Sequence, residues 1–128
     1  MSASNDLETK LLNVVFNATA YAGQSTLYVQ LHTGDPGEAG TSNVASEPTR
    51  KSVTFGNATG TAPTQVANDS APSWTNYPGS VTENVNYVSL WDAVTAGNCV
   101  CSGAIGTNNV NPGDTVTFPI GTLIVTLD

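Results

Sequence analysis

The stretch that most constrains the fold is Leu27–Thr41, LYVQLHTGDPGEAGT, where an alternating segment meets a strong chain-turning motif. Apolar and polar residues alternate from Leu27 to His32, which is the period of a half-buried β-strand. Gly34-Asp35-Pro36-Gly37 then ends the strand, because proline has no N–H to donate and the Asp35 side chain can accept from nearby backbone amides. The stretch predicts a strand that stops at a sharp corner and leads into a polar loop, Glu38–Pro48.

Short apolar-rich segments separated by Gly, Pro and Asn follow through the rest of the chain. Val85–Asp92 is almost continuously apolar, which is typical of a central strand covered on both faces. Asn111-Pro112-Gly113-Asp114 predicts a tight turn. Further strands are expected at Lys51–Phe55, Gln65–Ala67, Ser73–Thr75, Asn98–Ile105, Thr115–Phe118 and Thr122–Leu127.

The first segment has a different period. Leu7, Leu11, Val14 and Val15 recur at helical spacing, and Ser4, Asn5 or Asp6 can cap the first amides, so we expect a helix over Asp6–Phe16. Residues 1–22 are then a helical N-terminal segment of one domain spanning residues 1–128. The whole pattern predicts an all-β fold, an antiparallel two-sheet β-sandwich of jelly-roll or immunoglobulin-like topology with one short N-terminal helix.

The net charge and the few basic residues of the chain disfavour two classes of partner. The chain has a net charge of −7 and three basic residues, Lys10, Arg50 and Lys51. Binding to nucleic acid or to an anionic membrane depends on clustered Lys and Arg, so neither partner is expected. The polar start has no apolar segment after it, so no secretory signal is expected, and no apolar run approaches a membrane span.

The two cysteines, Cys99 and Cys101, lie two residues apart in an expected strand. Such residues share a face, and a disulfide closing so short a loop would be strained. We interpret both as small buried side chains in a reducing compartment. The one histidine, His32, is too distant in sequence to suggest a zinc site with them.

Catalysis has little support in the residue pattern. His32 lies on the polar side of its strand and is interpreted as a solvated or interface residue, and no nucleophile-elbow motif accompanies it. Asp35 and Glu38 are the nearest carboxylate pair, and a calcium loop is a better functional reading of them than a glycosidase site. Their position in a Gly-rich turn also explains both as turn residues. No enzymatic activity, metal or cofactor is expected.

Four aromatic residues are candidates for a recognition surface. Tyr87 and Trp91 lie in the expected central strand and are interpreted as core. Trp74 and Tyr77, flanked by Pro72 and Pro78, are expected to be more open. They are candidates for a sugar-binding surface or for anchors in a protein–protein interface, where Trp and Tyr concentrate.

The order of these motifs resembles a family of small tailed-bacteriophage virion proteins of the head-decoration (cement) or tail-fibre type. In that family an N-terminal helix with a Leu-Leu pair precedes a strand ending in an Asp-Pro-Gly corner. The later strands end in Trp-Asp-Ala and in a final Leu-x-Val-Thr-Leu segment. The residues that carry the resemblance are Leu11-Leu12, Leu27-Tyr28-Val29, Leu31-His32-Thr33, Asp35-Pro36-Gly37, Val53-Thr54-Phe55, Leu90-Trp91-Asp92-Ala93, Gly97, Ser102-Gly103-Ala104, Asn111, Gly113-Asp114-Thr115 and Leu123–Leu127.

The resemblance covers nearly the whole chain and departs from the family in the longer segment Asn57–Pro78. It implies a structural role without catalytic residues. We therefore expect a capsid cement protein, assembled in the bacterial cytoplasm and located on the capsid surface of the virion. It would be a homotrimer bound to the major capsid protein lattice. The alternative is a tail-fibre or minor tail component involved in host attachment. The expected interface residues are Leu7, Leu11, Glu38, Asn43, Trp74 and Tyr77.

Overall fold

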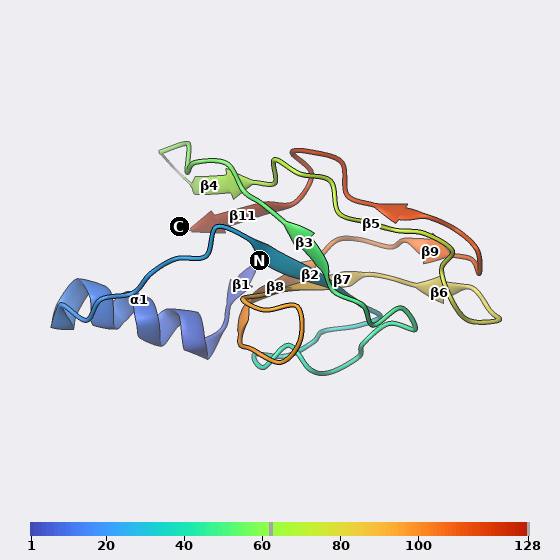
Figure 1. The fold of residues 1–128 in the computed structure, drawn as a ribbon, viewed down its shortest axis with the longest axis horizontal. Coiled ribbons are helices and arrows are strands. Elements are labelled where there is room, and N and C mark those ends of the chain that lie inside the picture. Colours follow the sequence, from blue (N-terminus) through green and yellow to red (C-terminus); the bar gives the residue numbers. More distant parts are fainter. Residues whose placement is uncertain (62, 128) are drawn as a thin grey trace.

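A computed structural model describes residues 1–61 and 63–127; Ala62, between the expected strands Lys51–Phe55 and Gln65–Ala67, and Asp128, at the end of the expected domain, lie outside the described residues. The described strands pair antiparallel, and one helix precedes most of them (Figure 1). This confirms the expected all-β, sandwich-like fold with a short N-terminal helix. The elements are β1 (Ser2–Ala3), α1 (Asn5–Asn17), β2 (Leu27–His32), β3 (Lys51–Val53), β4 (Thr64–Ala67), β5 (Ser73–Trp74), β6 (Glu83–Asn84), β7 (Tyr87–Trp91), β8 (Cys99–Ala104), β9 (Asn109–Val110), β10 (Val116–Thr117) and β11 (Ile124–Leu127).

One layer of the fold is a five-stranded sheet in the order β1-β8-β7-β2-β3. The second layer consists of three two-stranded ribbons, β4 with β11, β5 with β10, and β6 with β9. The strand Tyr87–Trp91 is central in the sheet, and Val88 to Trp91 are all buried, so the expectation of a central strand covered on both faces is confirmed.

The apolar core lies between the sheet and the three ribbons. Side chains at alternate positions of β2 face the core, together with those directly opposite them on β7, as the strand period requires. The ribbons and their connections supply the other side of the core. The buried residues of this cluster are Val29, Leu31, Ala45, Val53, Trp74, Tyr77, Val85, Val88, Leu90, Cys101, Val110 and Leu123.

The opposite face of the sheet, which we call the polar face, carries Gln30, His32 and Ser89. Residues 33–50, the 33–50 loop, cover it. Gly40 packs so closely there that a Cβ atom on it would lie 2.7 Å from the Cys99 sulfur and 2.8 Å from Cζ2 of Trp91. The polar face of the sheet, which the alternating pattern of the strand predicts to be in contact with water, is therefore enclosed by the 33–50 loop.

Two local details differ from expectation. Leu90 of β7 pairs with Cys101, but the next residue, Trp91, pairs with Cys99 and not with Val100. This β-bulge places one extra residue, Val100, in β8, so Cys99 and Cys101 lie opposite neighbouring residues of β7, which face opposite sides of the sheet. Cys101 joins the core cluster, whereas Cys99 lies beside Gly40 and Trp91 on the polar face, so the expectation of a shared face is wrong. Both thiols are buried and unbridged, as expected.

The N-terminal segment forms an arm, residues 5–26, that projects from the sandwich at the left of Figure 1. Ser4 caps α1 by accepting from the Leu7 amide, and its own amide donates to the Val100 carbonyl at 3.0 Å. Residues 18–26 return along the helix, and the Lys10 ammonium lies 5.2 Å from the Tyr21 ring centre. The expected helix Asp6–Phe16 is confirmed to within one residue at each end, although Ser2–Ala3 pairs as a strand.

Candidate interaction surfaces

His32 is fully buried in a hydrogen-bonded chain on the polar face. Its Nδ1 lies 2.8 Å from the Ser42 carbonyl oxygen and therefore donates, and its Nε2 lies 2.7 Å from the Ser89 hydroxyl. The Trp91 indole N–H also donates to Ser89 Oγ, at 2.7 Å. In the neutral imidazole, which burial favours, Nδ1 carries the proton and Nε2 accepts from the Ser89 hydroxyl. Burial lowers the pKa of His32, and its bonds to the 33–50 loop oppose that effect in part.

The expectation that His32 is solvated or lies at an interface is therefore wrong. Its strand position was predicted correctly, but the 33–50 loop closes over the polar face and removes the imidazole from solvent. Both ring nitrogens serve structural bonds to Ser42 and Ser89. The same arrangement brings a serine beside the histidine, but deep inside the fold.

Trp74 and Tyr77, expected to be open, are 1% and 2% exposed. The Trp74 indole N–H donates to the Thr49 carbonyl at 2.7 Å, and its ring packs edge-on against Phe118 with centroids 6.0 Å apart. The Tyr77 hydroxyl donates to Glu83 Oε2 at 2.6 Å, and burial together with this bond raises the phenol pKa. Trp74 therefore joins the second layer to the 33–50 loop, and the Glu83 carboxylate beside Tyr77 accepts from the Ser46 amide of the same loop at 3.0 Å. Neither residue offers a free aromatic surface.

Glu38 and Asn43, the loop candidates, are both exposed. Asn43 has a left-handed backbone with φ of 53°, and its side-chain amide donates to the Asp35 carbonyl at 2.7 Å. The Asp35 carboxylate accepts from the Gly37 amide at 2.9 Å, as the turn chemistry of the corner predicts. Within residues 1–61 and 63–127 no group of three or more His, Cys, Asp or Glu side chains is placed to hold a metal ion.

The other two candidates, Leu7 and Leu11, lie on α1, which has no buried residue. Leu7 is half-buried at the base of the arm, and Leu11 is 38% exposed. The exposed fraction rises toward the end of the helix, to 69% at Val15 and 76% at Phe16. An amphipathic helix normally buries its apolar stripe, so the exposure of this one is unusual for a folded domain.

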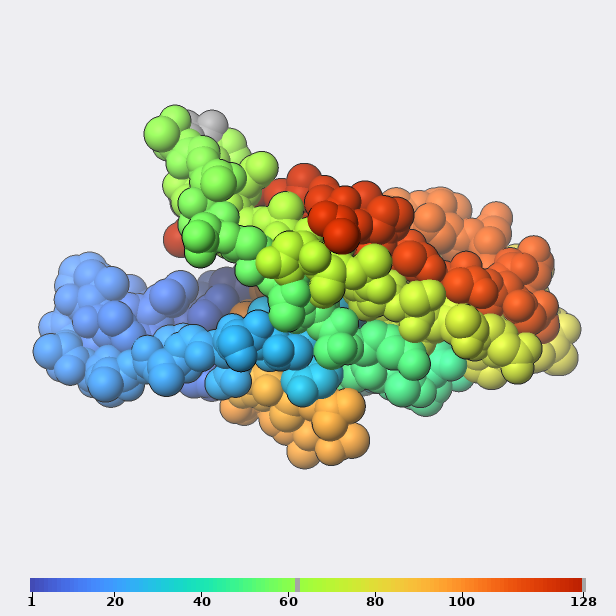
Figure 2. Space-filling view, turned by 45° about the horizontal axis from the view of Figure 1, so that its top comes forward, coloured from blue at the N-terminus to red at the C-terminus, as the bar shows by residue number. Residues whose placement is uncertain are grey.

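A mainly apolar cleft opens beside the base of the arm. Its volume is about 260 Å³, and it lies between the five-stranded sheet and the β4–β11 ribbon. Figure 2 shows the hollow between the blue N-terminal arm and the green projection that precedes β4. No charged side chain lines this cleft, which is formed by Leu7, Gln24, Ser25, Leu27, Val53, Phe55, Val66, Leu90, Val100, Cys101 and Val125.

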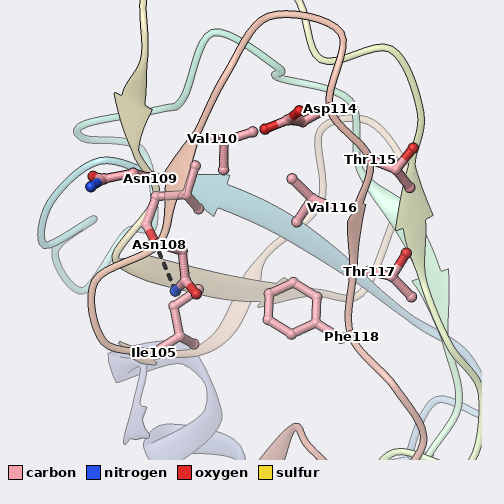
Figure 3. Close-up of a pocket in the computed structure, with 10 residues that line it drawn as sticks. Ile105, Asn108, Asn109, Val110, Asp114, Thr115, Val116, Thr117 and Phe118 are labelled. Atoms are coloured by element: carbon pink, nitrogen blue, oxygen red, sulfur yellow. Dashed lines mark hydrogen bonds between the residues drawn. The ribbon is translucent and has the colours of Figure 1, made fainter.

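A second hollow of about 400 Å³ lies between β9 and β10 (Figure 3). Val110, Val116 and Phe118 point into it, whereas Thr115 and Thr117 point away. The Asn108 amide at its edge already donates to the Val85 carbonyl at 3.2 Å. This hollow therefore has a mixed lining, in which apolar side chains lie beside the polar residues Asn108, Asn109, Asp114, Thr115 and Thr117.

No described helix is both long and apolar enough to cross a membrane. A search of curated proteins found no match. The family model described as podophage GP4 fiber I protein gp80 matches residues 2–126, which is almost the whole chain. That match supports the phage-virion part of the family resemblance and a structural role in the virion. The chain belongs to the podophage GP4 fiber I protein gp80 family.

Proposed function

We propose that this protein is a structural component of the fibre region of a podophage, where it contributes to host attachment. The observation that carries this proposal is the family match over residues 2–126, because the family is described as a fibre protein. The structure adds a compact sandwich with an exposed apolar arm, a form suited to attachment to other virion proteins. This replaces the capsid-cement role as the preferred interpretation.

The cement role stays as the second candidate because of one feature. The described residues form a compact sandwich without a coiled coil or a repeated β shaft, and a small compact unit suits a shell decoration present in many copies. In that role the partner is the major capsid protein lattice. In the fibre role the partners are tail proteins and copies of this chain.

Copy number and location in purified virions separate the two roles. Quantitative mass spectrometry against the major capsid protein should give a few copies to a few dozen, and antibody labelling should fall at the tail. Hundreds of copies spread over the head would refute the fibre role and support cement.

Virions assembled without this protein give an independent test. Loss of the fibre component should lower adsorption to host cells and leave the temperature of DNA release unchanged. A lower temperature of DNA release with normal adsorption would instead support a cement role. A matched preparation complemented with the wild-type protein controls for assembly defects.

A further inference from the structure

The second layer of the sandwich has a gap between β9 and β10. The turn at residues 111–114 joins these two strands, but β9 pairs with β6 and β10 pairs with β5, and no described pairing joins β9 to β10. In Figure 3 the two strands lie on opposite sides of the hollow of about 400 Å³. The hollow is therefore a break in a β-layer, with a strand on each side of it.

The backbone of β10 is unpaired on the side that faces the hollow. The Phe118 amide donates to the Pro72 carbonyl at 3.1 Å, which places the backbone groups of Val116 and Phe118 toward β5. Successive residues of a strand direct their N–H and C=O groups to opposite sides. The N–H and C=O groups of Thr115 and Thr117 therefore point away from β5 and toward the hollow.

The facing side of β9 has the same property. The Val85 amide donates to the Asn108 carbonyl at 2.9 Å, so the backbone groups of Asn108 are directed toward β6. The N–H and C=O groups of the next residue, Asn109, therefore point to the opposite side, where the hollow lies. A strand edge with unpaired backbone groups is a template for pairing with another extended chain. The gap has such an edge on each side.

The floor of the gap is apolar and belongs to the core of the sandwich. Val85 is 1% exposed and Val110 is 6% exposed, and both belong to the core cluster. Ile105, Val116 and Phe118 are partly buried against the same cluster. A strand laid in the gap would place every second side chain on this floor and the others on the outer surface. The gap therefore favours an extended chain with apolar residues at alternate positions.

We propose that an extended segment of another virion protein fills this gap as an added β-strand between β9 and β10. The unpaired backbone groups of both edges supply its hydrogen bonds, and the apolar floor selects its inward side chains. A segment of about four residues, at roughly 3.3 Å each, matches the length of residues 115–118.

Charge and strand pairing indicate that the segment comes from a different protein. Asp114 is the charged side chain of the lining, in a chain of net charge −7, so the outward positions of the segment should be neutral or basic. The outermost strands of this chain, β1 and β11, are already paired with β8 and β4. A second acidic copy is therefore a poor donor. The added strand goes beyond the fibre role and does not depend on where the protein lies in the virion.

A synthetic peptide tests this chemistry on the purified full-length chain. The probe is a peptide with blocked ends in which valine alternates with threonine between terminal lysines. Titration followed by NMR should shift the backbone amides of Asn109, Thr115 and Thr117 and slow their hydrogen exchange. The same peptide with N-methyl groups on alternate backbone amides keeps its side chains but cannot donate along one edge. It should bind the wild-type chain at least about tenfold more weakly.

Proline substitution tests the strand edge from the side of the protein. Thr115→Pro removes one of the free N–H groups and should weaken peptide binding at least about tenfold. Thr126→Pro is the matched control, because Thr126 is exposed, lies in β11 outside the hollow and, by the same alternation, directs its backbone away from β4. It should leave peptide binding unchanged. The N-methylated peptide makes the same comparison without altering the fold.

Assembled virions test which molecule supplies the strand. A photo-cross-linking amino acid in place of Asn109 should join this chain to one segment of a different virion protein. A cross-link to a second copy of this chain, or none, would overturn the choice of occupant. Failure of the alternating peptide to bind, equal binding of the two peptides, or amide shifts confined to other strands would overturn the added strand. Binding of an oligosaccharide from host lipopolysaccharide in the hollow, without peptide binding, would also overturn it.

Discussion

The close approach of the 33–50 loop to the polar face can be tested by replacing two glycines with alanine. Gly37 and Gly40 have nearly the same positive φ, 71° and 70°, and lie three residues apart. A Cβ atom at position 37 would meet nothing within 4 Å. At position 40 it would lie 2.7 Å from the Cys99 sulfur and 2.8 Å from a Trp91 ring carbon. The pair therefore separates backbone strain from packing.

Gly37→Ala should reduce the free energy of unfolding by about 1–2 kcal/mol, the cost of a left-handed alanine. Gly40→Ala carries the same cost and adds about 1–3 kcal/mol for overpacking against Trp91, so its total is about 2–5 kcal/mol. At roughly 3–6 °C per kcal/mol for a domain of this size, its melting temperature should fall several degrees further than that of Gly37→Ala.

Thermal unfolding followed by tryptophan fluorescence and circular dichroism measures both variants. The double variant Gly40→Ala with Cys99→Ala should lose less stability than the sum of the two single changes, because the nearest clashing atom is removed. Equal destabilisation by Gly37→Ala and Gly40→Ala would refute the reasoning. It would mean that the loop does not pack on Trp91 and that the polar face is not closed as described.

Three further predictions concern buried polar groups. His32 is the one histidine of the chain and its pKa is lowered by burial, so the unfolded state binds more protons below about pH 6.5. The contribution of His32 to stability should be fully present above that pH and should be lost as the pH drops toward the folded-state pKa. His32→Gln should therefore abolish the slope of melting temperature against pH between pH 7 and pH 5. An unchanged slope would contradict this. Burial raises the pKa of Cys99 to about 11 and of Cys101 to about 12. An aromatic disulfide reagent should therefore label neither thiol until denaturant is added. Rapid labelling of the native chain would show that the thiols are not buried as described. Tyr77→Phe removes the hydroxyl that donates to Glu83 and should cost about 1.5–3 kcal/mol in urea unfolding, whereas a neutral change would place that bond in solvent.

Local sequence patterns predicted much of the β fold because their causes are local. Alternation from Leu27 to His32 and the Asp35 turn need only neighbouring residues, and both are present as expected. The helix limits also follow from spacing and from the Ser4 cap. The short strands β1, β6 and β9 were not predicted, since two residues leave no measurable period and depend on a distant partner for pairing.

The wrong predictions at the candidate site concern residues that are buried by segments far away in the sequence. Trp74 lies between prolines in a polar segment, which indicated exposure, but the Thr49 carbonyl, 25 positions away, accepts its indole N–H. Asn68 follows the expected strand Gln65–Ala67 in a polar stretch, yet it is 1% exposed and its amide donates to the Ser70 and Pro119 carbonyls. Its oxygen accepts from the Leu123 amide, which joins the ends of β4 and β11. No local pattern indicates such partners.

His32 and α1 show the two ways in which a face pattern can mislead. Alternation placed His32 on a polar face, and polarity was read as contact with water, but the 33–50 loop satisfies each polar group there within the same chain. Helical spacing predicts an apolar stripe on α1, which normally implies burial, yet beyond the half-buried Leu7 its members Leu11, Val14 and Val15 are exposed in the described structure. Periodicity therefore indicates which face needs a partner and is silent on which segment supplies it. Where the chain supplies the partner, as at His32, the polar side chain is bonded inside the fold. Where it does not, as at Val14, the apolar side chain stays exposed.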